Sequence, residues 1–286
     1  MEQIRIAIIG GSGLYQIEGI EIEKELEIST PFGNPSEKIV VGRFGKEKVA
    51  FLPRHGKGHV RNPSKINYRA NIYALKSLGV EQIIAVGAVG SLKEEIKPGH
   101  FVFPDQIIDK TTKRISTFFD EITVHVGFSD PFCDEIRNIL KQKAHEMMLT
   151  VHDSGTYVCM EGPQFSTRAE SNLHRSWGAS LIGMTVLPEA KLAREAEICY
   201  ATIAIPTDYD CWYTEEHVSV EAILDNLNKS LNNTKSLIRN SLQELINRPR
   251  NCMCSTALNN ALLTQPDYIT KDKKQDLNIL IGKYFH

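Results

Sequence analysis

The sequence has few of the features that mark special classes of protein. It contains no long apolar run, so no segment reaches the roughly 18–20 residues that cross a membrane. The apolar stretch near its start, residues 6–9, is also too short for a signal peptide. No charge of one sign dominates, because 33 Lys and Arg oppose 35 Asp and Glu. The balanced charge therefore offers no general electrostatic attraction for nucleic acid or membranes. We expect a cytoplasmic globular protein that binds neither.

Cysteine is scarce as well. Six cysteines among 286 residues are too few for a disulfide scaffold, and four of them are scattered along the chain. Cys252 and Cys254 form a C-x-C pair, but no second pair lies at a spacing that completes the about four ligands of a zinc site. These spacings favour reduced thiols and no metal, with a redox or disulfide role for the pair as the alternative.

Short β-branched apolar runs alternate with helical patterns along the chain. This alternation predicts a single α/β domain over residues 1–250, with a mixed, largely parallel sheet flanked by helices. Residues 251–286 are expected to form a C-terminal extension, either a tail or a segment packed on a neighbouring subunit. The expected strands are 4–9, 38–41, 49–52, 82–86, 101–103, 156–159, 180–184 and 201–205, and the expected helices are 64–78, 166–177, 188–196 and 219–247.

Glycine-rich turns follow three of the expected strands. Residues 10–13 read Gly-Gly-Ser-Gly, where backbone N–H groups can approach an anion and the Ser12 hydroxyl adds a donor. A dinucleotide site is disfavoured because Tyr15 stands where its third glycine is needed, although a simple tight turn remains an alternative. Arg54 and His55 end another strand and offer donors to an oxyanion, with a solvated basic loop as the alternative. A similar turn begins at Gly87, so we expect these strand ends to form the walls of one pocket.

Two further segments carry candidate binding groups. Phe165 is a ring in a polar turn and is suited to stacking on a flat ligand, while Ser166 or Thr167 caps the following helix. Asp208 and Asp210 follow a buried strand, where carboxylates need partners. They can act as acid and base, accept from an amino group of a heterocycle, or bind metal, although no further ligands lie nearby for a metal. Their spacing does not choose among these roles.

Taken together, these segments resemble the 5'-methylthioadenosine phosphorylases of the trimeric purine nucleoside phosphorylase superfamily. The resemblance runs in order from about residue 4 to about residue 250. The matching segments are I-I-G-G-S-G-L, T-P-F-G-N-P-S, L-P-R-H-G-K-G-H, K-I-N-Y-R-A-N-I-Y-A-L-K, G-A-V-G-S-L, D-P-F-C, E-G-P-Q-F-S-T-R-A-E-S, G-M-T-V-L-P-E-A and T-D-Y-D-C-W.

The resemblance implies that phosphate attacks C1' of a nucleoside and a purine leaves. It implies no cofactor, because phosphate is a co-substrate, and it implies a homotrimer, or a hexamer built from two trimers, in which His125 reaches the site of an adjacent subunit. By position, the phosphate-binding residues are Ser12, Arg54, His55, Gly87, Ala88 and Thr185; the nucleoside-binding residues are Met184, Phe165, Asp208, Tyr209, Asp210 and His125; and the residues linked to selectivity are Ser166 and Val220.

Chemistry supports this assignment and sharpens it. A protonated Asp208 donates to purine N7 and neutralises the leaving group. Arg54 and His55 act in catalysis by holding the phosphate, whose negative charge opposes that of the cationic sugar. A carboxyl group also accepts from the amine of adenine, whereas asparagine suits a 6-oxopurine better. Apolar residues around Val220 favour a 5'-methylthio group, although such pockets discriminate only about a hundredfold. The alternatives are a broader purine nucleoside phosphorylase acting on adenosine, inosine, guanosine or methylthioinosine, and a nucleoside-binding relative without catalysis.

Several positions depart from the family pattern. Many relatives carry a hydroxyl or amide where this chain has Gly87, which leaves only backbone donors there. Gly183 replaces the asparagine of animal members, and with Ser12 and the C-x-C pair this is similar to archaeal members. The resemblance also brings a thiol prediction, since cysteines matching Cys133 and Cys199 are disulfide-bonded in some thermophilic relatives, in which the C-x-C pair is oxidised.

Overall fold

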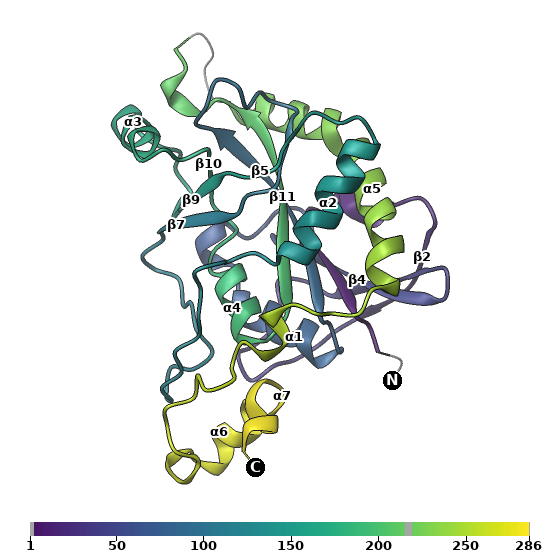
Figure 1. Ribbon diagram of the computed structural model, residues 1–286, viewed down its shortest axis with the longest axis vertical. Coiled ribbons are helices and arrows are strands. Elements are labelled where there is room, and N and C mark those ends of the chain that lie inside the picture. Colours follow the sequence, from purple (N-terminus) through teal and green to yellow (C-terminus); the bar gives the residue numbers. More distant parts are fainter. Residues whose placement is uncertain (1–2, 215–218, 286) are drawn as a thin grey trace.

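The computed structural model describes residues 3–214 and 219–285, with Ser12 described by its backbone alone. Its centre is one sheet of 11 strands (Figure 1). The strands are β1 (Ile6–Gly10), β2 (Ile20–Leu26), β3 (Ile39–Phe44), β4 (Glu47–Pro53), β5 (Gln82–Ser91), β6 (Phe101–Val102), β7 (Gln106–Lys110), β8 (Val151–His152), β9 (Thr156–Met160), β10 (Leu181–Gly183) and β11 (Cys199–Asp208).

Strand β5 organises the sheet because it pairs with three other strands. Its first residues pair in parallel with β1, its whole length runs parallel to β11, and its last two residues pair antiparallel with β10. Strand β4 lies parallel to β1 on the side away from β5, and β2 and β3 continue from it as antiparallel strands. The sheet is therefore mixed, and its central strands β4, β1, β5 and β11 all run in the same direction, as the sequence predicted.

Helices cover both faces of the sheet. The side chains of β1 alternate, so that Ile6 and Ile8 join one core and Ala7 and Ile9 join the other. Helices α2 and α5 pack together on the first of these cores, whereas α1 and α4 pack on the second (Figure 1). The helices are α1 (Tyr68–Ser77), α2 (Asp134–Glu146), α3 (Arg168–Ser176), α4 (Glu189–Glu195), α5 (Val220–Asn247), α6 (Lys271–Asp276) and α7 (Asn278–Ile281).

Most of the expected elements are present. The helix expected over residues 64–78 begins later, at Tyr68, because Pro63–Lys65 form a separate 3-10 turn capped by Asn62. Strand β7 and helix α2 were not expected from the sequence. Across residues 3–214 and 219–285, no helix combines the length and the apolar character needed to cross a membrane.

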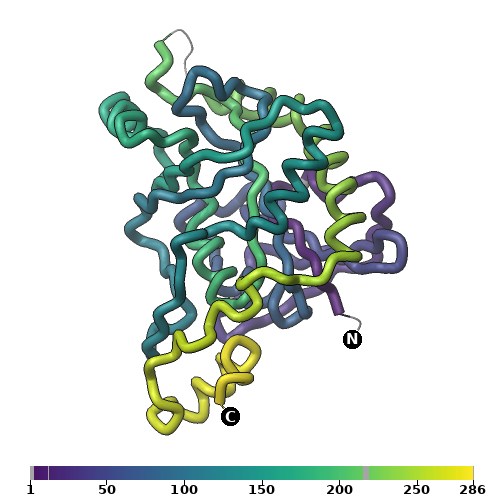
Figure 2. The backbone as a smooth tube through the Cα atoms, in the orientation of Figure 1, coloured from purple at the N-terminus to yellow at the C-terminus, as the bar shows by residue number. Residues whose placement is uncertain are grey.

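The extension after residue 250 packs on its own chain. Leu258, Ile269 and Leu280 are buried in the same core as α1 and α4. The Tyr284 hydroxyl donates to the buried Glu197 carboxylate, and Val124 forms a β-bridge with Leu262. Figure 2 traces this yellow segment along the lower end of the molecule. The expectation of a free tail is wrong, because the extension completes a core that α1 and α4 leave open. Its packing on a neighbouring subunit stays a prediction.

Candidate active site

A cavity of about 830 Å³ opens at the carboxyl ends of the central strands. Parallel strands end at the same edge of a sheet, so the turns after β1 and β4 meet the last residues of β5 and the end of β11 there. Helix α5 closes one side of the cavity, and the loops after β9 and β10 close another. The predicted pocket at the strand ends is therefore confirmed.

Arg54 follows β4 and is held in one orientation at the cavity. Its Nε and Nη2 each donate to the Glu189 carboxylate at 2.8 Å, and its Nη1 donates to the Val86 carbonyl at 2.9 Å. The Tyr200 hydroxyl donates to the same carboxylate at 2.8 Å. These bonds use only part of the five N–H donors of a guanidinium, so Arg54 retains donors for an anion. Burial opposes the charge of Arg54, but Glu189 holds its pKa above the usual value.

His55 is neutral in this site. Burial lowers the pKa of its imidazole to about 4, and the charge of Arg54 adds to the effect. Its Nδ1 lies 2.8 Å from the Arg61 carbonyl oxygen, which only accepts, so the ring hydrogen is on Nδ1. The other nitrogen, Nε2, is consequently an acceptor. The predicted position of His55 at the cavity is therefore present, and with this tautomer its Nε2 is the nitrogen left to meet a ligand.

The glycine turns line the same end of the cavity as Arg54 and His55. Gly10, Gly11 and Gly13 come from β1 and the turn after it. The turn predicted at Gly87 is wrong, because Gly87 and Ala88 belong to β5, which continues to Ser91 along β11. A Cβ added at Gly87 would lie 3.4 Å from Thr185 Oγ1, so the backbone of β5 and the Thr185 hydroxyl face one another across a short gap. Ser12 begins the 3-10 turn after β1, and its side chain lies outside the described part of the structure.

The two predicted carboxylates lie at the end of β11. The Asp208 carboxylate accepts from the Thr207 hydroxyl and from the Asp210 backbone N–H, each at 2.9 Å. Burial nevertheless raises the pKa of Asp208, and the nearby charge of Asp210 raises it further. Asp210 is itself 5% exposed, and within the described residues its Oδ2 has no hydrogen-bond partner. The cavity thus presents one carboxyl group disposed to hold a proton and one carboxylate oxygen that needs a donor.

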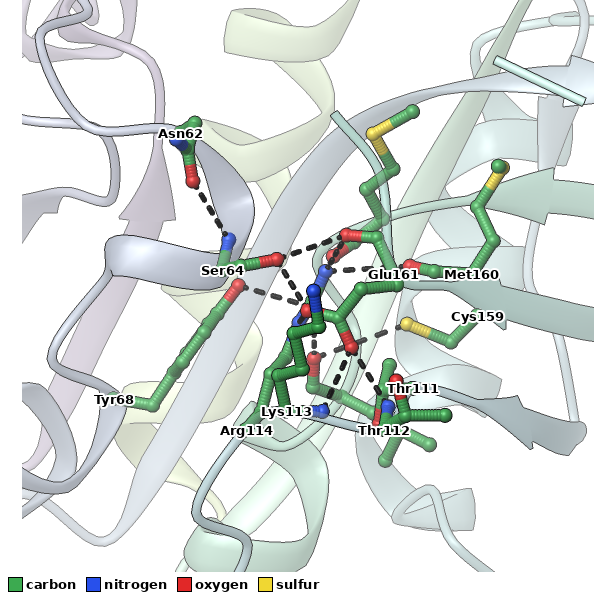
Figure 3. A network of polar contacts seen from close by, with 12 residues as sticks. Asn62, Ser64, Tyr68, Thr111, Thr112, Lys113, Arg114, Cys159, Met160 and Glu161 are labelled. Atoms are coloured by element: carbon green, nitrogen blue, oxygen red, sulfur yellow. Dashed lines mark hydrogen bonds and ion pairs between the residues drawn. The ribbon is translucent and has the colours of Figure 1, made fainter. Parts of the chain in front are cut away.

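Met184 and Phe165 line the cavity between the two ends already described. A buried arginine that the sequence did not single out holds their loops. Arg114 donates to the carbonyl oxygens of Met160, Glu161, Met184 and Leu187 (Figure 3). Burial alone would raise the pKa of Glu161, but hydrogen bonds from Ser64 and the N–H groups of Thr112 and Lys113 lower it to about 2. This network joins the loops after β7, β9 and β10.

Helix α5 contributes an apolar wall. Val220, Ile223, Leu224, Leu227 and Leu231 all line the cavity. Their spacing of three and four residues places them on one face of the helix, which begins after the cap residue Ser219. The predicted apolar pocket near Val220 is present.

Three of the predicted residues do not line the cavity of their own chain. Ser166 donates to Met160 Sδ at 3.8 Å, and Thr167, not Ser166, caps α3. The Tyr209 hydroxyl donates to the Glu94 carbonyl at 3.3 Å, and its ring packs against Trp212 and Tyr213. His125 is exposed, and its backbone N–H donates to the Ala261 carbonyl at 2.9 Å.

The cysteines are not scattered in space. Cys133 and Cys199 join the C-x-C pair, and the four sulfurs all lie within 4.8 Å of one another. All four are free thiols in the structure. The prediction of no metal rested on spacing along the chain, and the fold removes that reason. The carboxylates at the cavity do not belong to any comparable cluster among the described residues.

These features define a class of protein: an α/β fold whose strand ends form an anion site beside paired carboxylates. The profile of the phosphorylase superfamily matches residues 5–243, and the chain belongs to this superfamily. More particularly, curated relatives are S-methyl-5'-thioadenosine phosphorylases. The relative from Geobacter sulfurreducens is 52% identical, covering 99% of this chain and 100% of its own length. The relative from Hyperthermus butylicus is 51% identical, covering 90% of this chain and 95% of its own length.

Solved structures agree with this family assignment. A methylthioadenosine phosphorylase from an Antarctic soil metagenomic library has a TM-score of 0.94 and 46% identity, covering 98% of this chain and 99% of its own. A mutant adenosine/methylthioadenosine phosphorylase from Schistosoma mansoni, solved with methylthioadenosine, has a TM-score of 0.86 and 35% identity, covering 91% of this chain and 99% of its own. The extension after residue 250, for which the sequence suggested no counterpart, is within the part shared with the Geobacter relative.

Proposed function

We propose that the protein cleaves 5'-methylthioadenosine with phosphate, giving adenine and 5-methylthio-α-D-ribose 1-phosphate. The observation that carries the proposal is the shared cavity of Arg54, Asp208 and the apolar face of α5. These three features of the cavity suit the three parts of the substrates: Arg54 suits the phosphate anion, Asp208 suits the purine, and the apolar face of α5 suits the 5'-methylthio group. The names of the relatives agree with this substrate.

The reaction follows from where the charges lie. A phosphate oxygen forms a bond to C1' as the bond between C1' and N9 breaks, and the bonding electrons leave with the purine. Arg54, the Gly87 and Ala88 backbone and the Thr185 hydroxyl would hold the phosphate, whose negative charge stabilises the cationic sugar. His55 Nε2 accepts the phosphate O–H, which directs the remaining oxygens toward the donors.

The carboxylates account for the leaving group. Since the pKa of Asp208 is raised, this residue can hold a proton and pass it to purine N7 as negative charge develops there. The unpartnered Oδ2 of Asp210 would accept from the exocyclic amine of adenine. A 6-oxopurine offers an acceptor in that place, which leaves a buried carboxylate opposite an oxygen atom. The site therefore favours a 6-aminopurine.

We further propose that the protein is a homotrimer, or a hexamer of two trimers, and that it needs no cofactor. His125 is exposed and does not line the cavity of its own chain, so its predicted role at the 5' group requires a neighbouring subunit. Met184 would lie under the ribose, and Phe165 against the purine. Ser166 and Tyr209 would act through their neighbours, because neither side chain borders the cavity.

Release of adenine from 5'-methylthioadenosine, measured with and without phosphate, tests the proposal. Adenosine, inosine and methylthioinosine serve as comparison substrates. We expect cleavage of the methylthio substrate only with phosphate, and poor turnover of inosine. Efficient turnover of inosine would indicate a broader purine nucleoside phosphorylase, and binding without turnover would contradict an enzymatic function.

The variant Asp208→Asn tests the base assignment. Its kcat/KM for 5'-methylthioadenosine should fall by about 10²–10⁴, the range for loss of a general acid, while the ratio of inosine to methylthioadenosine turnover should rise. Asp225→Asn is the matched control, because Asp225 is exposed on α5 and does not border the cavity. An unchanged preference between the two bases would refute the role of Asp208.

A further inference from the structure

Four cysteine sulfurs gather in a part of the protein that the proposed reaction does not use. Cys133 precedes α2, Cys199 begins β11, and Cys252 and Cys254 begin the extension. Cys252 Sγ lies 3.7 Å from Cys133 Sγ and 3.2 Å from Cys199 Sγ. All four sulfurs lie within 4.8 Å of one another, and none of these residues lines the active cavity. The fold has therefore brought together thiols from three separate segments of the chain.

The sulfur separations are of the size expected around a single metal ion, and all four cysteines are free thiols. A zinc ion binds thiolates at about 2.3 Å, and a tetrahedron of that size places its sulfurs about 3.8 Å apart. A disulfide bond needs sulfurs about 2.05 Å apart. The separations of 3.7 and 3.2 Å are close to the first arrangement and well outside the second. The sulfurs are also too close together to enclose a cluster of several irons.

We propose that Cys133, Cys199, Cys252 and Cys254 bind one zinc ion in a structural site. This proposal replaces the sequence-based prediction of no metal. Four thiolates complete the tetrahedral coordination of zinc and leave no position for substrate, which is typical of structural sites. Soft thiolate ligands favour zinc over magnesium, calcium or manganese. On binding, each ligating thiol releases its proton to solvent as its sulfur donates an electron pair to the metal.

The surroundings suit a thiolate-bound metal. Cys133, Cys199 and Cys254 are buried in the core beneath α2 and α5, which excludes water. Cys133 is the N-cap of the 13-residue helix α2, whose free N–H groups stabilise negative charge. The backbone N–H of Cys254 is directed at the Cys252 sulfur. Such donors to the sulfurs stabilise metal thiolates.

The site would fasten the extension to the catalytic domain. Two of its ligands, Cys252 and Cys254, lie just after the end of α5, and the other two lie at the N-cap of α2 and at the first residue of β11. Metal binding would thus fix the path of the chain where it leaves α5. This inference does not depend on the proposed reaction, because zinc content is measured without any substrate.

The first experiment uses elemental mass spectrometry to measure the zinc content of the whole chain. The protein is produced in cells grown with zinc and is purified without chelators. We expect about one zinc per chain, as for one four-cysteine site. The double variant Cys252→Ser/Cys254→Ser should lose it. Cys211→Ser is the matched control and should retain it, because Cys211 lies outside the cluster. Zinc retained by the double variant would overturn the proposal.

A second measurement uses the unmodified chain, so it does not depend on how a variant folds. Reduced, metal-free protein is titrated with Co²⁺, which gives intense visible absorption when four thiolates surround it. Saturation at about one equivalent, reversed by zinc, is the expected result. No such absorption, or an intact mass about 2 or 4 Da below that of the reduced chain in zinc-free purified protein, would show disulfides instead and overturn the proposal.

Discussion

At the residue scale, burial sets the pKa of His55 and one backbone contact sets its tautomer. The Arg61 carbonyl fixes the hydrogen on Nδ1, and burial lowers the pKa of the ring to about 4. A sequence shows that a histidine follows a strand, but it does not show which carbonyl its ring meets or how deeply it lies. The position of His55 at the cavity was therefore predictable from the sequence, whereas its tautomer and its lowered pKa were not.

This state makes the stability of the fold depend on pH. The unfolded chain binds a proton at His55 below about pH 6.5, whereas the folded chain does so only near pH 4. Between these values the unfolded state holds more protons, so stability rises with pH and is lost as pH falls. The shift corresponds to about 3 kcal/mol. We expect His55→Asn to flatten the dependence of unfolding free energy on pH between 4 and 6.5, measured by urea titration. Equal slopes in His55→Asn and the unmodified chain would contradict this account.

Arg54 gives a second prediction at this scale. Replacement by alanine would leave the buried Glu189 without its counter-charge, which costs about 3–5 kcal/mol of folding stability. A loss of phosphate binding in that variant could then not be distinguished from unfolding. Arg54→Lys keeps the charge but loses the paired donors. We expect the KM for phosphate to rise about 10- to 100-fold, equivalent to about 1.4–2.8 kcal/mol, with a much smaller change in the KM for nucleoside.

The control for this change is another buried arginine. Arg137 donates to the carbonyl oxygens of Phe103 and Asp153 and does not border the cavity. Arg137→Lys should therefore lower stability without a selective effect on phosphate. If Arg54→Lys raised both KM values by the same factor, the assignment of Arg54 to phosphate would fail.

At the scale of elements, the sequence left the start of α3 open between two hydroxyl residues. The structure selects Thr167, which accepts from the Glu170 N–H while the Glu170 carboxylate accepts from the Thr167 N–H. Ser166 and Thr167 both carry the hydroxyl group that an N-cap needs, and only Thr167 has a glutamate, Glu170, three residues later. The choice of Thr167 was therefore predictable from the sequence.

The two candidates now serve as a matched pair. Thr167→Ala should cost about 1 kcal/mol, the usual contribution of an N-cap, and Ser166→Ala should cost less than about 0.5 kcal/mol. Because α3 is short and lies at the surface, the loss should appear as faster amide hydrogen exchange in Arg168–Ser176, by about fivefold. Equal exchange in the two variants would show that the cap does not limit opening of this helix.

The limits of sequence-based prediction are clearest for the elements that hold the site. The ends of β1 and β11 were predictable, because their apolar runs stop at Gly10 and before Asp208, whereas the turn predicted at Gly87 was wrong, because β5 continues to Ser91. The contacts that hold these strand ends in place were not predictable. Glu189 binds Arg54 from 135 residues away along the chain, and Arg114 binds carbonyl oxygens up to 73 residues away. Long-range pairing of this kind leaves no periodic pattern. The gathering of Cys133 and Cys199 with the C-x-C pair escaped prediction for the same reason.

At the scale of the whole molecule, the extension and the segment around His125 form one unit. The Leu263 N–H donates to the Thr123 carbonyl, and the His125 N–H donates to the Ala261 carbonyl, each at 2.9 Å. The extension therefore positions the backbone that presents His125 outward, away from the cavity of its own chain. A site shared between subunits needs such a rigid support, because an exposed loop would lose too much entropy on reaching a neighbour's ligand.

Complementation between two defective chains tests the shared site. His125→Ala and Asp208→Asn should each lower cleavage of 5'-methylthioadenosine. Co-expressed in equal amounts, the two variants should form mixed oligomers in which about a quarter of the sites combine an intact Asp208 with an intact His125 of the adjacent subunit. Activity should then exceed that of either variant alone. Asp208→Asn mixed with the double variant Asp208→Asn/His125→Ala is the control, because none of its sites can recover. If His125 served the cavity of its own chain, the first mixture would show no recovery either, because every chain in it lacks one of the two groups.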